Sequence, residues 1–503
     1  MISFEEFQQL ASTYNVIPLT ERVFSDLHTP VSVYLAIRPR HGSSFLLESA
    51  ELSEKVGRFS YVGSNPITTI EERGGQTAIR RGKHIETKQQ NIFDVLEEMS
   101  HEYKSPVLDG ALPFSGGFVG YVGYECSASI ERVPIHVDAG EEPDALFGLF
   151  ETVIQFDHHT QLVTLCHNVL VDHNAPLDKQ FQKGQQQLAT LKLQLRNMSF
   201  TSTGFSLSGN GISSRHKKSE FISAVETAKD NIREGDIFQV VLSRQSQTHF
   251  NGDLFQVYRA LRTINPSPYL FFIDFGETKI VGSSPEVLVR VEGREVEVRP
   301  IAGTRRRGAS PAEDASLEEE LRNDSKERAE HVMLVDLGRN DVGRVSELGS
   351  VSTTSFMHVE RYSHVMHLVS EVRGKLREEC TPIDVLKACF PAGTVTGAPK
   401  VRAMEIIHSL EPERRGAYAG AVGYLGFDGS LNTCIAIRTI LAHRDVLKMQ
   451  AGAGIVADSV PENEYAETES KSMVLLEALR LAANGLATPP FTREQKKLAV
   501  SKL

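Results

Sequence analysis

The stretch Cys389-Phe-Pro-Ala-Gly-Thr-Val-Thr-Gly-Ala-Pro-Lys400 is typical of a loop that turns into a helix. Gly393 and Gly397 let the backbone turn and approach a ligand closely, and Pro399 stands where a first helical residue is favoured. Helical spacing continues over 401–410, so the loop is expected to end on free N–H groups that suit an anion. Taken alone, the stretch is explained better by an ordinary helix entry than by an anion site. The choice between the two depends on the rest of the chain.

The bulk composition indicates a globular protein of several domains. A length of 503 residues allows two to four domains at about 150 residues each, and a net charge of −11 argues against a nucleic-acid partner. No apolar run approaches the ~18 residues of a membrane span, and the acidic, polar start lacks a secretory signal. The five cysteines are scattered, with no Cys-x-x-Cys pair. Such usage favours a reducing, cytoplasmic location.

The order of strand-like and helix-like segments predicts an α+β fold with largely antiparallel sheets. Alternating runs at 31–37, 44–47 and 59–62 favour strands, and short turns such as Phe427-Asp-Gly-Ser430 favour hairpins. The segment Gly117–Glu125 is echoed by Gly420–Asp428. The echo indicates two related halves, although chance similarity between glycine-rich strands explains it equally well.

Composition shifts divide the chain into four regions. Residues 1–196 form an N-terminal region, and 197–214, rich in Ser, Thr, Gly and Asn, are expected to be a linker. Residues 215–485 form a second folded region. Residues 486–503 are expected to be a loosely attached tail, with Pro489-Pro490 and four lysines.

Two acidic helices are candidates for a metal site. Asp324 is placed to cap the first helix, so that Glu327 and Glu330 share one face. The second helix begins at Pro461, presents Glu464 and Glu467 on one face, and places Lys471 one turn further on. One or two carboxylates with water and substrate oxygens are the usual ligands of Mg²⁺. A solvated acidic face is the plainer explanation for either helix alone.

Cationic and proton-carrying groups accompany these helices. Tyr418 is expected on a glycine-rich strand and Arg438 on the returning strand of the same hairpin, where Arg can hold a carboxylate bidentately. His367 is a candidate for proton transfer, although a strand histidine is more often simply hydrogen-bonded. Glu286 ends a tight turn and is either an acid of raised pKa or a solvent-facing turn residue. Together these groups indicate a site for a small dicarboxylate, with Mg²⁺ and no organic cofactor.

The motifs resemble those of the chorismate-utilising enzymes, and among them the large subunits of anthranilate synthases. Over roughly residues 30–482 the resemblance is carried by four blocks in order: Pro300-Ile-Ala-Gly-Thr304, Ala329-Glu-His-Val-Met-Leu-Val-Asp-Leu-Gly-Arg-Asn-Asp341, Phe390-Pro-Ala-Gly-Thr-Val-Thr-Gly-Ala-Pro-Lys400 and Gln450-Ala-Gly-Ala-Gly454. It implies two related halves whose antiparallel sheets pack as a sandwich flanked by helices. It also implies conversion of chorismate and ammonia into anthranilate and pyruvate, the first step of tryptophan biosynthesis.

The resemblance also assigns roles to individual residues. Glu330 and Glu467 would hold Mg²⁺, which grips the ring carboxylate of chorismate, and Tyr418 and Arg438 would hold the enolpyruvyl carboxylate. Glu286 would protonate the departing hydroxyl. His367 would assist loss of the C2 proton, and Thr394 would orient the substrate. Further substrate contacts are expected from Gly303, Thr304, Gly452, Ala453, Gly454 and Lys471.

Two positions distinguish this chain from other members of the family. Isochorismate and salicylate synthases carry a lysine that activates water where this chain has Gln239. Aminodeoxychorismate synthases often carry a nucleophilic lysine where this chain has Ala302. Both differences favour direct use of ammonia. Aminodeoxychorismate synthase component I and a non-catalytic ligand-binding homologue remain the alternatives.

The resemblance further implies regulation and a partner. A tryptophan feedback site would include Glu48 and Ser49 together with Pro268, Tyr269 and Leu270. The parts played by Lys55 and Lys400 stay open. None of the five cysteines lies in a Gly-x-Cys-x-Gly elbow, so ammonia would come from a separate glutamine amidotransferase small subunit in a hetero-oligomer.

Overall fold

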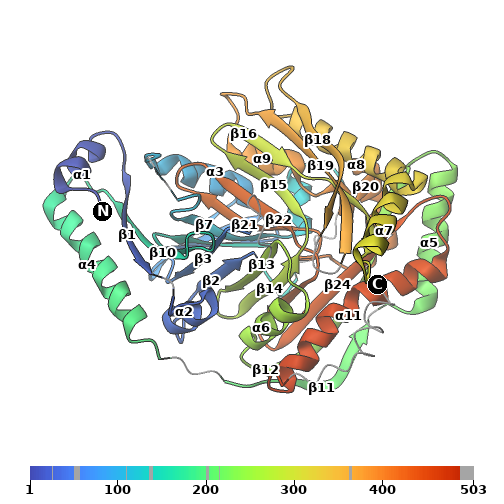
Figure 1. Cartoon of the computed structure of the whole chain (residues 1–503), viewed down its shortest axis with the longest axis horizontal. Coiled ribbons are helices and arrows are strands. Elements are labelled where there is room, and N and C mark those ends of the chain that lie inside the picture. Colours follow the sequence, from blue (N-terminus) through green and yellow to red (C-terminus); the bar gives the residue numbers. More distant parts are fainter. Residues whose placement is uncertain are drawn as a thin grey trace.

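The computed structural model describes residues 1–24, 26–49, 57–108, 110, 112–134, 140–199, 203–214, 216–361 and 365–487. In this part of the chain two large antiparallel sheets lie face to face and helices cover their outer sides (Figure 1). The predicted α+β sandwich is therefore confirmed. Lys55 and most of the predicted tail lie outside the described residues. None of the described helices is long and apolar enough to cross a membrane.

The first sheet joins strands from both ends of the chain. Its neighbours in order are β1 (Val16–Phe24), β10 (Leu162–Leu170), β9 (Thr152–Asp157), β3 (Phe59–Ser64), β2 (Ser44–Glu48), β13 (Tyr269–Asp274), β14 (Thr278–Ser284), β23 (Thr439–His443), β24 (Val446–Ile455), β12 (Gln239–Gly252) and β11 (Phe205–Ser214), with β20 (Gly397–Ala398) paired to β12.

The second sheet also combines strands from the N-terminal and C-terminal parts of the chain. Its neighbours in order are β17 (Ile301–Arg306), β19 (Val365–Lys375), β16 (Glu295–Val298), β15 (Val287–Glu292), β22 (Leu431–Ile435), β21 (Ala421–Gly426), β7 (Gly117–Val122), β8 (Ala145–Phe150), β4 (Thr68–Arg73), β5 (Gln76–Arg81) and β6 (His84–Lys88), with β18 (Ser352–Arg361) paired to β19.

Helices lie on the outer faces of the two sheets (Figure 1). The α-helices are α1 (Phe4–Ala11), α2 (Pro30–Ile37), α3 (Ile92–Glu102), α4 (Leu177–Arg196), α5 (Lys218–Arg233), α6 (Phe255–Ile264), α7 (Pro311–Asn323), α8 (Ser325–Gly343), α9 (Pro382–Cys389), α10 (Lys400–Leu410) and α11 (Pro461–Ala483). Two short 3₁₀ helices are η1 (Tyr124–Ser129) and η2 (Gly393–Val395).

The two halves of the chain meet once in each sheet. In the first sheet β2 pairs with β13, which places Glu48 opposite Leu270. In the second sheet β7 pairs with β21, which places Phe118 opposite Leu425. The echoed segments at Gly117–Glu125 and Gly420–Asp428 therefore lie side by side, as two related halves require.

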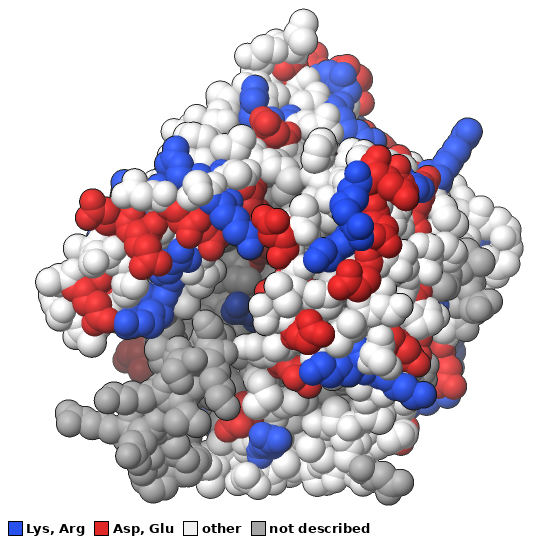
Figure 2. All heavy atoms as spheres, turned by 90° about the vertical axis from the view of Figure 1, so that its right-hand side faces the viewer, with Lys and Arg blue, Asp and Glu red and all other residues white. Residues whose placement is uncertain are grey.

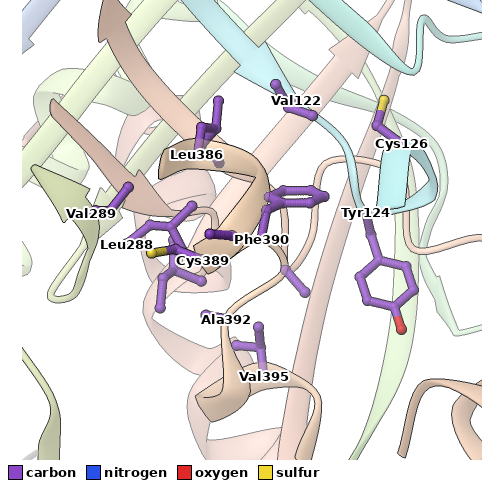
Figure 3. Packing of buried hydrophobic residues seen from close by; sticks show 14 of the residues in the cluster. Val122, Tyr124, Cys126, Leu288, Val289, Leu386, Cys389, Phe390, Ala392 and Val395 are labelled. Carbon is purple, nitrogen blue, oxygen red and sulfur yellow. The ribbon is translucent and has the colours of Figure 1, made fainter. Parts of the chain in front are cut away.

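Strand periodicity explains how one chain fills three apolar layers. Along β13, Phe271 and Ile273 point between the two sheets, whereas Leu270 and Phe272 point outward towards the helices, because successive strand residues face opposite sides. A third cluster lies between the second sheet and its helices, extends to β12 and β24 of the first sheet, and includes Phe390 and Val395 (Figure 3).

Two expectations from the sequence are wrong in detail. Residues 30–37 form helix α2 rather than a strand, because Thr29 caps the helix and Pro30 occupies its first turn. Part of the predicted linker, Phe205–Ser214, is strand β11, which pairs along β12. The prediction used polar composition, but an edge strand buries only one face and tolerates Ser and Asn.

Candidate active site

The loop at residues 390–399 is held by apolar packing along its length and by strand pairing at its end. Phe390, Ala392 and Val395 are buried in the apolar cluster shown in Figure 3. Gly397 then pairs with β12 as part of β20. A side chain at Gly397 would overlap the Gln239 carbonyl, and its φ is +139°, so glycine is required there.

The helix entry after this loop differs from the prediction. Pro399 is the N-cap residue, and Lys400 is the first residue of α10. The Lys400 Nζ lies 2.9 Å from Asp341 Oδ2 at the end of α8, and both side chains are about nine-tenths buried. Lys400 is therefore committed to an ion pair, which answers the question that the sequence left open.

Thr394, at the centre of the loop, faces Glu286. Burial raises the pKa of Glu286 to about 7, and nearby Thr394 and Lys471 offset part of that rise. The Thr394 hydroxyl is buried and lies beside the Glu286 carboxyl group. A carboxyl group with a pKa near 7 and a buried hydroxyl thus stand together, and pKa values shifted in this way are common at functional sites.

The two acidic helices do bring their carboxylates together. Burial raises the pKa of Glu330 on α8, and the charges of Glu327 and of Glu467 on α11 raise it further. Gln239 hydrogen-bonds to Glu330 and Lys326 lies nearby, and both oppose the rise. The Lys471 Nζ is 2.7 Å from Glu467 Oε1 and 3.0 Å from the Gly452 carbonyl.

This donor set fits a hard divalent cation. It offers carboxylate oxygens from two elements, and their mutual repulsion is what a cation would relieve. Among the described residues no group of three or more carboxylate, His or Cys side chains converges tightly enough to hold a metal by itself. A cation at Glu330 and Glu467 would therefore need further oxygens from water or from a bound anion.

The strand segment 450–454 forms the next wall of the site. A side chain at Gly452 would overlap the Tyr418 hydroxyl, and one at Gly454 would stand 2.7 Å from the Gln239 amide nitrogen. Ala453 is fully buried, and its methyl group belongs to the third apolar cluster, which also contains Phe390 and Val395. The two glycines therefore let Tyr418 and Gln239 approach the backbone closely, and Ala453 can contact a substrate only through its peptide group.

Arg438 and Tyr418 lie close to the predicted site but not on the predicted strands. Tyr418 lies in the turn before β21, and Arg438 lies between β22 and β23 with a φ of +50°. Burial lowers the pKa of Arg438. No carboxylate among the described residues pairs with it. Its Nη1 donates to Asn265 Oδ1 at 3.4 Å.

His367 on β19 is positioned for proton transfer. Its Nδ1 lies 3.0 Å from the Gly303 carbonyl and 3.0 Å from Thr304 Oγ1. A carbonyl only accepts, so Nδ1 carries the proton and Nε2 is the basic nitrogen. Burial and Arg438 lower the His367 pKa, whereas the Gly303 carbonyl and Glu360 oppose the shift. The imidazole is thus mainly neutral at pH 7.

Sequence reasoning overlooked the roles of two polar side chains here. Gln239 was interpreted only as the place of a missing lysine, yet its amide bonds to Glu330 and fills the space beside Gly454. Asn265 was not among the predicted site residues, yet it contacts Arg438. A polar residue directly before the apolar run Val240–Leu242, at the fully buried start of β12, is the signal that could have identified Gln239.

The predicted regulatory residues also meet, across the β2–β13 junction. Glu48 is buried, and its carboxylate already accepts hydrogen bonds from Tyr258 and from Arg262, whose Nε is 3.0 Å away. The Ser49 hydroxyl is buried and lacks a hydrogen-bond partner among the described residues. Tyr269 donates to Asn432 at 3.2 Å. The segments are therefore adjacent, with Pro268 and Leu270 buried beside them.

The surface near α5, α7 and α8, on the right of Figure 1, is hollowed near its centre. Lys, Arg, Asp and Glu side chains gather on both sides of the hollow (Figure 2). Charged walls around a concavity favour a small charged ligand over an apolar one.

Comparisons with known proteins agree with this geometry. Residues 42–477 match the family described as chorismate binding enzyme. A relative from Acetivibrio thermocellus named anthranilate synthase component 1 is 44% identical over 489 residues, which cover 95% of this chain and 98% of the relative. The relative of the same name from Aquifex aeolicus is 44% identical over 495 residues, with coverages of 96% and 98%.

Solved structures show the same relationship. The crystal structure of anthranilate synthase component I from Streptococcus pneumoniae aligns with a TM-score of 0.73 at 38% identity and covers 90% of this chain and 99% of that one. The menaquinone-specific isochorismate synthase of Escherichia coli aligns with a TM-score of 0.70 at 20% identity, with coverages of 95% and 98%. The latter likeness concerns the fold alone.

Proposed function

Because the chain belongs to the chorismate-binding enzyme family, we propose that it converts chorismate and ammonia into anthranilate, pyruvate and water as the large component of an anthranilate synthase. The observation that carries the proposal is the 44% identity, over 95% of this chain, to a relative of that name. Gln239 and Ala302 add support, since neither can act as the lysine on which water or a covalent enzyme intermediate depends.

The two carboxylates of chorismate would bind at opposite ends of the site. Glu330 and Glu467 would hold Mg²⁺, which when bound supplies positive charge for the ring carboxylate of chorismate. Lys471 and the peptide groups of 452–454 would add contacts at the same end. Arg438 and Tyr418 would hold the enolpyruvyl carboxylate, which suits a guanidinium that no carboxylate of the described residues neutralises.

Proton transfer would fall to two groups with shifted pKa values. Glu286, with its pKa near 7, would give a proton to the C4 hydroxyl, which leaves as water while ammonia bonds to C2. Neutral His367 would then take the C2 proton through Nε2, and the ring becomes aromatic as the enolpyruvyl group departs and is protonated to pyruvate. Thr394, Gly303 and Thr304 would orient the ring and His367.

We propose that the ammonia comes from a separate glutamine amidotransferase subunit and that tryptophan inhibits the reaction. The name component 1 of the relatives supports a partner. The unsatisfied Ser49 hydroxyl beside Pro268 and Leu270 supports a small polar effector at the β2–β13 junction.

A product assay tests the activity directly. The purified chain is incubated with chorismate, MgCl₂ and ammonium at pH 8, and anthranilate is followed by fluorescence while pyruvate is measured with lactate dehydrogenase. Equal amounts of both products, with none formed without ammonium, are expected. Accumulation of aminodeoxychorismate without pyruvate would assign the chain to that neighbouring activity instead. Adding L-tryptophan to the same assay tests inhibition.

A further inference from the structure

The two carboxylate-bearing helices have few buried residues in the turns that carry Glu330 and Glu467. Over residues 325–333 of α8, the buried side chain is His331, which directly follows Glu330. Over residues 462–474 of α11, the buried side chain is Thr468, which directly follows Glu467. In each of these turns the fully buried side chain is thus polar, and in α11 the half-buried Tyr465 adds an apolar contact to Phe221 of α5.

His331 connects α8 to the second sheet. Its Nε2 lies 2.6 Å from the Ser370 hydroxyl on β19, and neither side chain is exposed. The Ser370 Oγ also accepts the Met357 N–H of β18 at 2.9 Å, and the Ser370 N–H donates to the Pro300 carbonyl at 3.1 Å. Ser370 therefore holds the helix against β19, which also carries His367, and against the segment that leads to Gly303.

Thr468 connects α11 to the first sheet in a similar way. Its Oγ1 donates to the Tyr465 carbonyl at 2.7 Å and accepts from Arg244 Nη1 on β12 at 3.0 Å. The Arg244 guanidinium lies 3.9 Å from the centre of the Tyr465 ring. Two contacts from one arginine therefore fix this turn of the helix both along and around its axis.

We propose that His331 and Thr468 are a matched pair of positioning residues that set the rotation of α8 and α11 and thereby aim Glu330 and Glu467 at a shared cation. This inference rests on the proposed function, which assigns the cation to these carboxylates. Apolar packing has no preferred direction, whereas a hydrogen bond weakens steeply away from its preferred angle. Consecutive helical residues differ by about 100° around the axis, so fixing residue i+1 also fixes the direction of residue i.

Such anchors are needed because the carboxylates of the site repel one another. The Glu467 and Glu327 charges disfavour ionised Glu330, so the cation-free site pushes the carboxylates apart. Metal sites demand ligand placement within about 0.5 Å, and partners that orient the ligands typically contribute 10- to 100-fold in metal affinity.

The variants S370A and T468V each remove one anchor without touching a carboxylate. Binding of Mn²⁺ to the full chain is measured by electron paramagnetic resonance, with chorismate present and ammonium absent so that no turnover occurs. We expect the dissociation constant for Mn²⁺ to rise about 10-fold in each variant and T468S, which keeps the hydroxyl, to stay within about twofold of the wild type. T227V is the matched control, because among the described residues the one partner of the Thr227 hydroxyl is the Ser223 carbonyl of its own helix α5.

The melting temperature without metal separates positioning from general stability. A fall in melting temperature with unchanged Mn²⁺ affinity in folded S370A and T468V overturns the inference. If S370A does not fold, T468V and T468S decide the question. A wild-type chain that binds no Mn²⁺ overturns the metal assignment of the proposed function, whereas wild-type binding with unaffected variants overturns only the inference.

Discussion

Asn265 holds Arg438: the amide oxygen of Asn265 accepts a hydrogen bond from Arg438 Nη1 at 3.4 Å. The Asn265 Nδ2 in turn donates to the Ser283 hydroxyl at 2.8 Å, and the Ser283 N–H donates to the Arg438 carbonyl at 3.2 Å. The arginine proposed to bind a substrate carboxylate is therefore oriented through its side chain by Asn265, in the segment before β13, and through its backbone by Ser283 of β14.

The substitution N265A should weaken chorismate binding more than it slows chemistry. The hydrogen bond is long, so its loss is expected to raise KM for chorismate about three- to tenfold with kcat nearly unchanged. R438K keeps the charge but loses the planar fork, and a fall of about 100-fold in kcat/KM is expected. Steady-state kinetics at saturating Mg²⁺ and ammonium measure both. An N265A effect confined to kcat would contradict an orienting role.

The pH dependence should show two limbs with known signs. Glu286 acts in its protonated form, so kcat/KM is expected to fall as pH rises through about 7. His367 acts in its neutral form, and its lowered pKa places the acid limb below its ordinary value of about 6.5. The profile is measured at constant concentration of free ammonia, because ammonium itself titrates. E286A should lose about 10²- to 10⁴-fold in rate and lack the alkaline limb; an unchanged limb in this variant would assign it to another group.

Neutralising either proposed metal ligand should remove turnover while leaving the fold intact. E330Q and E467Q are expected to lower kcat/KM by about 10³-fold, since a bound cation contributes several kcal/mol to charge stabilisation. Circular dichroism should be unchanged, because Glu467 is exposed and Glu330 only half-buried. Glu469, exposed on the same helix, provides the control E469Q. Full activity after treatment with EDTA would remove the metal from the mechanism.

The contact between Gly452 and Tyr418 should appear as non-additivity. G452A forces a methyl group into the space of the Tyr418 hydroxyl and is expected to raise KM for chorismate at least about 10-fold. Y418F removes that hydroxyl, so G452A/Y418F should be less impaired than the product of the two single effects predicts. A double-mutant cycle on kcat/KM measures the coupling, and strict additivity would mean that the two residues act independently.

The buried pair of Lys400 and Asp341 should be costly to break but not to replace. Burial raises the pKa of Asp341 in spite of Lys400, so the attraction does not recover the full cost of desolvation. K400M alone is therefore expected to destabilise the chain by about 3 kcal/mol, and K400M/D341L by about 1 kcal/mol or less. Urea unfolding of the three proteins tests this, and equal losses in the two variants would show that packing, not charge, dominates.

Periodicity and turn chemistry predicted most of the elements but not how they are assembled. The strands at 44–47 and 59–62 follow from local pattern, since each alternates with the period of a strand, and they correspond to β2 and β3. Residues 30–37 misled the prediction because a short helix buried on several sides has no clear polar face, and only its cap at Thr29 marks it. The pairing of β2 with β13 could not be predicted from local pattern, because Glu48 and its partner Leu270 are 222 positions apart in the sequence and meet only in the folded chain.

The candidate residues of the site could be predicted from the sequence, whereas their placement on particular strands and turns could not. The carboxylate helices, His367 and Glu286 were identified from residue type and position, and the structure brings them into one region. The placement of Arg438 and Tyr418 in turns was missed, because the glycine-rich stretch from Gly420 on was extended too far in both directions. The role of Lys400 could not be predicted, because its partner, Asp341, lies 59 residues away in sequence.

The sharing of both sheets between the two halves has a consequence for biosynthesis. When the N-terminal half leaves the ribosome, the edges of β2 and β7 have no partners, since β13 and β21 are made later. Unpaired strand edges invite aggregation, and late, non-local pairing slows folding. The nascent chain is thus expected to need chaperone protection until β21 is synthesised, and separately expressed halves should recover a folded protein only when they are produced together.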